Sequence, residues 1–189
     1  IGKLEGVLTK IKHHGFISVC VRVNGDSHCI TGIRTTFNFL TLFAYLELIK
    51  GGIGNFLQGI AFGTTKRIEM KSDVGTCVVI HSHKLHSPIV LEEIDEEIKG
   101  IEQDNHKHSW FYDVCFKGKK LICANTCGKV CTISARGDRV GNFSPYRDAK
   151  RRVYRTVSFL SIPNAIYRTD IGEGTQAMEG LLKGKGWIT

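Results

Sequence analysis

Apolar residues recur along this chain at two spacings, and each spacing predicts a kind of element. Near the N-terminus, at Leu4, Val7, Leu8 and Ile11, they recur every three or four positions with lysines off the stripe, which predicts a short amphipathic helix that ends at Gly15. Residues 16–23 instead alternate and are rich in β-branched side chains, so they predict a strand. Asn24-Gly25-Asp26 is a strong hairpin turn signal, and the return strand is expected over 28–33.

Short apolar runs bounded by glycine and polar residues predict strands through the rest of the chain. An acidic and then polar stretch, 92–108, separates two groups of them and is interpreted as a connector. The predicted organisation is an N-terminal β-barrel over 1–91, that connector, and a C-terminal β-barrel over 109–189. The further predicted strands are 41–49, 56–62, two strands within 66–94, and then 110–116, 119–124, 129–134, 152–162 and 165–168.

Composition adds a charge and a redox argument to this pattern. The formal net charge of +8 indicates an acidic partner, with nucleic acid first and an anionic membrane surface second, although an inert basic surface fits as well. Seven cysteines without a signal peptide predict reduced thiols and a cytosolic protein, and Ile1-Gly2-Lys3 is typical of excision from a longer chain. The most apolar region, 37–62, is interrupted by charges and glycines and falls short of the ~20 apolar residues of a membrane span, so none is expected.

The order of several short motifs resembles the picornavirus 3C cysteine proteases, the hepatitis A type in particular. An N-terminal LEGVLTKI helix leads into a CVRV strand and a hairpin, and a Gly51-Gly52 turn precedes a long ribbon. Then come DVG, a VVI strand and a connector that begins LEEI at Leu91. This resemblance implies an all-β, chymotrypsin-like fold of two β-barrels with a short N-terminal helix.

The resemblance also implies a cysteine nucleophile, a histidine base and an acidic orienting residue, and this chain departs from that set. Arg34 occupies the position of the histidine, and a guanidinium cannot act as a general base at neutral pH. Cys77 occupies the position of the acidic residue, although Asp73 lies four residues upstream. The histidine that reads the substrate has no counterpart, because no histidine follows His108.

Two placements of the nucleophile stay open. Cys127, in Thr126-Cys127-Gly128, resembles the nucleophile motif but lies early in the second barrel. The glycine-rich segment 172–182 lies at the expected distance but places Glu179 where the cysteine should be. If the chain is active, Cys127 with His28 as base and Asp73 as orienter gives the right chain order, whereas a solvent-facing hairpin histidine is the alternative for His28.

Two other constellations have simpler explanations. Three histidines, His81, His83 and His86, lie close together in the sequence, and a histidine–x–histidine pair on a strand points both rings to one face, as metal sites and rolling-circle nickases require. Tyr146 to Lys150 would then be the nucleophile region, but the solvated face of a ribbon is the favoured explanation. Four cysteines could form a zinc cluster with His106 or His108, yet their spacing lacks paired C-x2-C knuckles, so buried thiols are expected and no metal or cofactor is predicted. These four are Cys115, Cys123, Cys127 and Cys131.

The densest basic stretch combines arginines with tyrosines, as backbone phosphate contacts and base stacking require. It predicts an RNA-binding surface at Arg147, Lys150, Arg151, Arg152 and Arg155, against the alternative of a solvated face.

These observations lead to one predicted function and two alternatives. The prediction is a viral 3C-like pseudoprotease in the host cell cytoplasm that has lost proteolysis and binds viral RNA or viral and host proteins. The alternatives are an active 3C-like cysteine endopeptidase that processes a polyprotein, and a basic nucleic-acid-binding β-domain unrelated to proteases.

Overall fold

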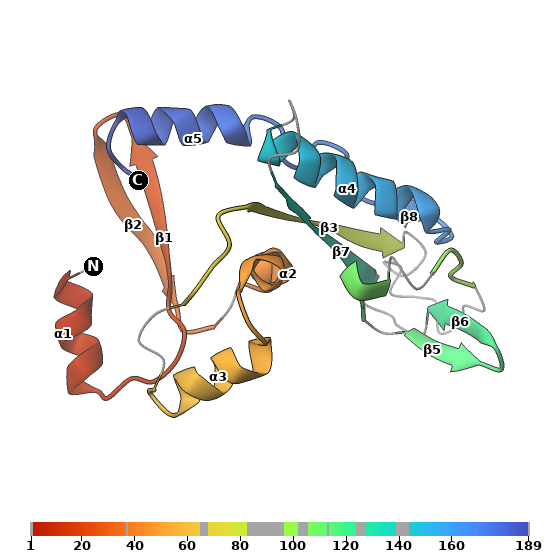
Figure 1. The fold of residues 1–189 in the computed structure, drawn as a ribbon, viewed down its shortest axis with the longest axis horizontal. Coiled ribbons are helices and arrows are strands. Elements are labelled where there is room, and N and C mark those ends of the chain that lie inside the picture. Colours follow the sequence, from red (N-terminus) through yellow and green to blue (C-terminus); the bar gives the residue numbers. More distant parts are fainter. Residues whose placement is uncertain are drawn as a thin grey trace. The chain divides into compact units, whose positions relative to one another are not determined.

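The protein is described by a computed structural model covering residues 2–36, 38–64, 68–82, 97–101, 106–112, 114–123, 128–138 and 144–188 (Figure 1). The chain divides into two compact units. Unit 1 comprises Ile1–Leu42 and Ile49–Lys71, and unit 2 comprises Phe43–Leu48 and Ser72–Thr189. The connector predicted over 92–108 falls partly on residues 92–96 and 102–105, which lie outside the described residues.

Unit 1 begins with the predicted helix and hairpin. Helix α1 spans Gly2–Lys10, and strands β1 (Ser18–Asn24) and β2 (Ser27–Arg34) pair antiparallel as a two-stranded sheet. Gly25 has a φ of 60° in the connecting turn, a conformation that glycine adopts without steric cost. The register shifts between Cys20 and Val21, where β2 has one extra residue, Thr31, and therefore carries a bulge. The sequence pattern therefore located the two strands correctly and the helix in kind, although α1 ends at Lys10 rather than at the predicted Gly15.

Two predicted strands of the first half are helices instead. Helix α2 spans Phe39–Leu48 and replaces the strand predicted over 41–49, and α3 spans Ile53–Ala61 where 56–62 was predicted as a strand. Apolar residues occur almost throughout α2, so neither spacing stands out in its sequence. In α3 the buried positions are Phe56 and Gly59, which are three residues apart and therefore share a helix face.

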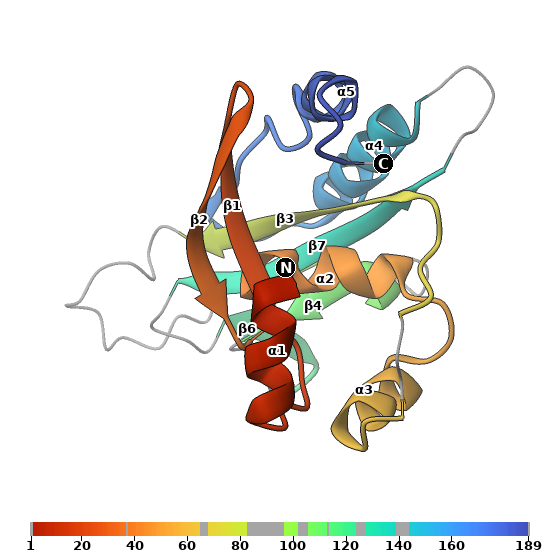
Figure 2. The ribbon, with the colours of Figure 1, turned by 90° about the vertical axis from the view of Figure 1, so that its left-hand side faces the viewer.

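Unit 2 is built on a four-stranded antiparallel sheet with strand order β4-β7-β3-β8 (Figure 2). β3 and β7 pair along most of their length, from Val74 opposite Gly137 to His81 opposite Lys129. A separate hairpin, β5 with β6, forms a two-stranded sheet, and a short 3-10 helix, η2, leads into β4. The bounds are β3 Val74–Ser82, η2 His106–His108, β4 Ser109–Phe111, β5 Val114–Lys117, β6 Lys120–Cys123, β7 Lys129–Gly137 and β8 Ala165–Ile166.

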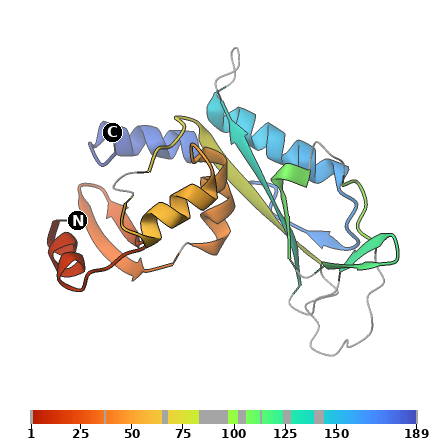
Figure 3. The same cartoon turned by 60° about the horizontal axis from the view of Figure 1, so that its bottom comes forward.

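One face of this sheet carries the hydrophobic core of unit 2. Helix α4, Pro145–Phe159, packs along β3 and β7 (Figure 3). Its buried residues recur every four positions and meet alternate residues of the two strands. Gly137, at the end of β7, allows this approach, because a Cβ there would collide with the backbone of Pro145 and Ala149. The core includes Val78, Ile80, Cys131, Ile133, Ala135, Val153 and Val157.

The second half of the sequence prediction also missed helices. The strand predicted over 152–162 is mostly α4, which begins with Ser144 as its N-cap and Pro145 in its first turn. The glycine-rich segment 172–182, interpreted as a nucleophile loop, overlaps α5, Thr175–Gly184. The all-β, two-barrel fold class is therefore wrong. The described residues form α-helices together with open two- and four-stranded sheets, a mixed α/β arrangement.

Candidate functional site

A connected polar network lies on the face of the unit 2 sheet opposite α4. Glu47 of α2 accepts hydrogen bonds from the Ser134 hydroxyl on β7 at 2.6 Å and from His108 Nδ1 at 2.7 Å. The Ser134 hydroxyl in turn accepts a hydrogen bond from Trp110 Nε1 on β4 at 2.9 Å. We call these four residues, Glu47, His108, Trp110 and Ser134, the Glu47 network. Ser134 and His108 contact the carboxylate directly, and Trp110 is connected to it through the Ser134 hydroxyl.

The electrostatics of the network set the protonation state of His108. Its hydrogen bond to Glu47 raises the pKa of the imidazole above the ordinary value, and partial burial and the charges of Lys107 and Arg136 oppose that rise only in part. An ionised carboxylate is acceptor-only, so Nδ1 of His108 must carry the proton. Nε2 is then available for a partner, as a donor when the ring is charged and as an acceptor when it is neutral. The Glu47 side chain is 12% exposed and that of His108 is 45% exposed, so the histidine lies on the solvent side of the pair.

Aromatic side chains support the network. The ring of Phe43, one turn before Glu47 on α2, lies 5.0 Å from the Trp110 ring and 6.2 Å from the Tyr112 ring, measured between centroids. The Tyr112 hydroxyl and Thr132 on β7 are hydrogen-bonded to each other. These contacts fix α2 against β4 and β7 and therefore fix the position of Glu47.

Backbone packing and an ion pair complete this face. A Cβ on Gly75 of β3 would lie 2.5 Å from the carbonyl oxygen of Ala44, so a glycine is needed where α2 crosses the sheet. Arg136 of β7 pairs with Asp73 at 3.2 Å just before β3 begins. Both signs of charge therefore occur along the β7 side of this face.

The residues predicted as a catalytic triad are distributed over two units and an undescribed segment. His28 is exposed on β2 in unit 1, and Asp73 lies in unit 2, where it pairs with Arg136. Cys127 lies outside the described residues.

The three residues read as degenerate family positions have ordinary structural partners or settings. Arg34 is the last residue of β2, opposite Ser18. Burial raises the pKa of the Cys77 thiol on β3, the opposite of what a reactive thiolate needs. Glu179 on α5 accepts hydrogen bonds from the Tyr146 hydroxyl and from Lys183, the latter at 2.9 Å.

The proposed metal constellations likewise do not assemble in what is described. His81 lies on β3, while His83 and His86 are outside the described residues. Cys123 and Cys131 are buried, Cys115 is exposed on β5, and burial raises the pKa of Cys131 to about 12. Across the described ranges, no group of three or more histidine, cysteine, aspartate or glutamate side chains could hold a metal ion.

The predicted RNA-binding residues lie on α4, and Lys150, Arg151 and Arg152 are engaged in ion pairs. Lys150 contacts Glu173 at 2.6 Å, Arg151 contacts Asp148 at 2.8 Å, and Arg152 contacts Asp148 at 2.7 Å. Arg152 also pairs with Asp138 at 3.0 Å. Arg155 lies over the ring of Phe159, and the backbone N–H of Arg147 donates to the N-cap Ser144. RNA binding by this helix stays a prediction.

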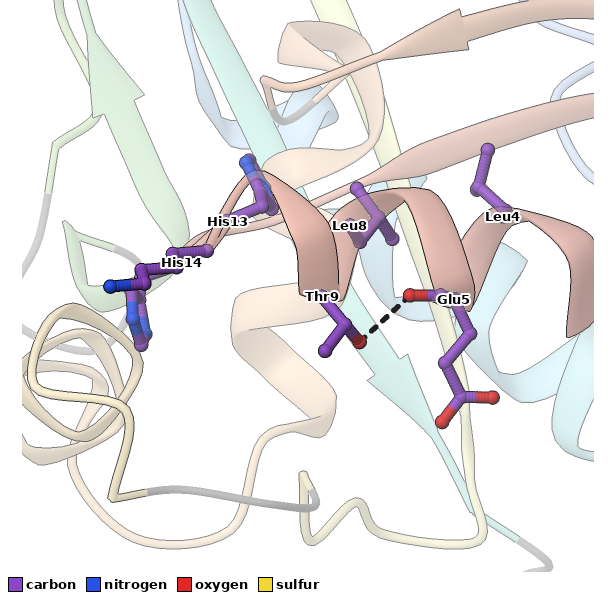
Figure 4. A pocket seen from close by; sticks show the side chains of 7 residues that line it. Leu4, Glu5, Leu8, Thr9, His13 and His14 are labelled. Atoms are coloured by element: carbon purple, nitrogen blue, oxygen red, sulfur yellow. Dashed lines mark hydrogen bonds between the residues drawn. The ribbon is translucent and has the colours of Figure 1, made fainter.

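A shallow hollow in unit 1 runs along α1 (Figure 4). Leu4 and Leu8 form an apolar wall, and the Thr9 hydroxyl is turned back to donate to the carbonyl of Glu5 at 2.9 Å. His13 and His14 lie at the end of the helix but point in different directions, so they do not converge on a common ligand. The Glu47 network is the better candidate for a functional site.

Sequence reasoning missed most of this network. The sequence pattern predicts a strand over 41–49, which includes Glu47, and a strand that ends at Ser134. It suggests His108 only as a possible zinc ligand. The partners are separated by 61 and 87 residues along the chain, so no local motif connects them. The available signal was one acidic residue inside the apolar segment of α2, since buried carboxylates need partners.

Comparison with known proteins replaces the protease resemblance. No protein-family model matches the sequence, and no curated protein matches it. Among solved structures, the fold resembles a phosphoribosylamine–glycine ligase from Thermotoga maritima with a TM-score of 0.63 and 17% sequence identity. The match covers 82% of this chain but only 36% of the ligase chain, so this chain spans about a third of that protein's length.

The comparison overturns the assignments that followed from the protease resemblance. The 3C-like protease interpretation is wrong, and with it the functions of viral pseudoprotease and viral endopeptidase. The alternative of a nucleic-acid-binding β-domain is wrong in its fold, because the described residues are not all-β, whereas nucleic-acid binding itself stays a prediction. No helix in the described parts of the chain has both the length and the apolar character to cross a bilayer. At this level of identity the likeness shows a shared fold alone.

Proposed function

We propose that unit 2 is the substrate-holding part of a ligase-type protein and that it binds a small anionic substrate beside His108. The observation that carries the proposal is the hydrogen bond between Glu47 and His108, which leaves Nε2 of a half-exposed imidazole for a ligand. The likeness of the fold to a phosphoribosylamine–glycine ligase supplies the class of substrate.

The chemistry of the imidazole matches those substrates. Glycine carries a carboxylate and a phosphoribosyl compound carries a phosphate, and both are acceptors for a charged N–H donor. Because Glu47 raises the pKa of His108, the ring is charged over a wider pH range than an isolated histidine. Protonated His108 can therefore donate from Nε2 to either group while Nδ1 stays on Glu47.

Calorimetric titration with glycine and with ribose 5-phosphate tests this proposal. We expect at least one of the two probes to bind, and His108→Gln to weaken that binding by about tenfold, the loss of one charge-assisted hydrogen bond. Binding should also decline as pH rises through the raised pKa of His108, because the neutral ring no longer donates from Nε2.

The matched control is His28→Gln, which changes the same residue type on β2 in unit 1. It should leave the affinity for the probe unchanged. Absence of binding by both probes, or equal affinity in His108→Gln and the parent protein, would reject the proposal.

A further inference from the structure

Helix α4 carries a row of exposed arginines on the side that faces away from the sheet. Arg147, Arg151 and Arg155 follow one another at intervals of four residues, so their side chains are neighbours on one face of the helix. A buried residue stands two positions after each arginine, which is about 200° around the helix, on the face that packs against the sheet (Figure 3). We call Arg147, Arg151 and Arg155 the arginine row.

The other basic residues of α4 are held by carboxylates within unit 2. Lys150 contacts Glu173 at 2.6 Å, and Arg152 contacts both Asp148 at 2.7 Å and Asp138 at 3.0 Å. These two cations lie to either side of the arginine row. They neutralise acidic side chains of the same unit, so the row itself is the part of the helix that can attract an anion from outside.

The arginine row keeps donors available for such an anion. Arg151 contacts Asp148 at 2.8 Å, yet its side chain is 53% exposed while that of Asp148 is only 1% exposed. A guanidinium has five N–H donors in a planar fork, so one buried carboxylate does not exhaust Arg151. Arg147 and Arg155 are exposed on either side of it along the helix.

An exposed aromatic ring lies at the C-terminal end of the row. Phe159 is the last residue of α4 and is 55% exposed, and the guanidinium carbon of Arg155 lies 5.9 Å from the centre of its ring. The two tyrosines of the helix, Tyr146 and Tyr154, are instead hydrogen-bonded through their hydroxyls within unit 2. Phe159 therefore offers the flat surface on which a nucleic-acid base can stack next to an arginine.

We propose that the arginine row and Phe159 bind single-stranded nucleic acid. Successive arginines of the row are about 6 Å apart along the helix axis, and each can donate to the phosphate oxygens of a polyanionic backbone. Phe159 takes an unpaired base, which a double helix would keep in its own stack. The formal net charge of +8 adds long-range attraction for the same partner.

Two comparisons favour this partner. An anionic membrane suits α4 less well, because an interfacial helix buries a whole apolar face in the bilayer, whereas Phe159 is the one large apolar residue exposed on α4. The small-molecule site proposed at His108 lies on the opposite face of the unit 2 sheet. The inference therefore does not rest on that site.

Fluorescence anisotropy with a labelled single-stranded RNA of about 12 nucleotides tests the proposal. Three phosphate contacts predict that the logarithm of the affinity falls with the logarithm of the salt concentration with a slope of about −2. Arg147→Gln with Arg155→Gln removes two of the contacts. It should weaken binding at low salt by at least about tenfold and bring the slope to about −0.7.

A matched pair of substitutions controls for net charge. Arg22→Gln with Arg34→Gln removes two exposed arginines from the hairpin of unit 1, so it lowers the charge of the chain by the same amount. The affinity for RNA should stay within about twofold of the parent value, because these residues make none of the proposed phosphate contacts. An equal loss in the two double variants would assign the binding to net charge and overturn the proposal.

Phe159→Leu separates nucleic acid from other polyanions. It should weaken RNA binding by about fivefold or more without changing the salt slope, because a stacked base is lost and no charge is removed. The affinity for heparin, which has no bases, should not change. This variant decides the question even if circular dichroism shows that the double arginine variant loses helical structure.

Three further results would contradict the proposal. Absence of RNA binding by the parent protein, or binding that does not depend on salt, would show that the row makes no phosphate contacts. An unchanged affinity for RNA in Phe159→Leu would leave only a general polyanion surface. Tighter binding to phosphatidylserine vesicles than to RNA would assign α4 to an anionic membrane instead.

Discussion

A single carboxylate organises the chemistry of the candidate site. Glu47 accepts from Ser134 and His108 at once, and Trp110 completes the chain of donors. Such hydrogen-bonded networks are stable only while every polar group has a partner. Removing the charge of Glu47 should therefore change the other members of the network. The sequence could not predict this arrangement, because each member is ordinary in its local context and only the tertiary fold brings α2 onto β7.

Glu47→Gln should lower the pKa of His108 towards its ordinary value, because the hydrogen bond to the carboxylate is the largest cause of the upward shift. The pKa is measured by following the ring resonances of His108 against pH. Glu97→Gln is a suitable control, because Glu97 pairs with Lys99 at 3.4 Å and does not belong to the Glu47 network. An unchanged titration of His108 in Glu47→Gln would contradict the assignment.

The same pair makes stability depend on pH, and the sign follows from the direction of the shift. A histidine whose pKa is raised on folding stabilises the folded state below its ordinary pKa of 6.5, and this contribution is lost as pH rises through the folded pKa. The free energy of unfolding of the parent protein, measured with urea, should therefore fall as pH rises through the folded pKa of His108. In Glu47→Gln it should fall less over the same pH range.

At the scale of elements, the sequence predicted strands well and helices poorly. The strands β1, β2, β3 and β7 are runs of β-branched residues with turn signals beside them, so local propensity and tertiary structure agree. Helix α4 carried equally clear signals: a serine N-cap, a proline in the first turn and apolar residues at Ala149, Val153 and Val157. Its tyrosines and arginines were instead interpreted as a nucleic-acid surface next to a strand.

In helix α4, packing decides which polar side chains are available to bind a ligand. Asp148 is buried, and burial alone would raise the pKa of its carboxyl. The hydrogen bond from Arg151 and the charge of Arg152 outweigh burial and hold that pKa below its usual range. Part of the basic character of the helix thus serves its own folding, which sequence composition alone does not reveal.

Gly137→Ala should destabilise the protein by about 1–3 kcal/mol, because the added methyl meets the backbone where α4 begins and the helix must shift. Gly180→Ala is the matched control. A Cβ at Gly180 on α5 meets nothing within 4 Å, so the change should stabilise the helix by about 0.5–1 kcal/mol. Urea unfolding measures both values, and equal effects of the two substitutions would contradict this account of the β7–α4 contact.

At the scale of the whole molecule, the two units differ in how much core they possess. Unit 2 has a continuous core between its sheet and α4, whereas unit 1 has few buried residues in its described part and exposes Val21, Ile30 and Ile33 on its hairpin. The sequence could not predict this contrast, because apolar segments occur in both halves. The prediction of two barrels requires each half to bury its own apolar side chains. The division between the units also interrupts α2 rather than falling in a loop.

The units should therefore unfold at different urea concentrations, and the distribution of aromatic residues allows this to be measured. Both tryptophans and all five tyrosines belong to unit 2, so intrinsic fluorescence reports that unit alone, whereas far-UV circular dichroism reports both. For the isolated chain, we expect loss of circular dichroism to begin at a lower urea concentration than the fluorescence change, since transitions seen by two probes coincide only in a two-state protein. Helix α1 and the β1–β2 hairpin account for the early loss. Coincident transitions would show that unit 1 folds cooperatively with unit 2.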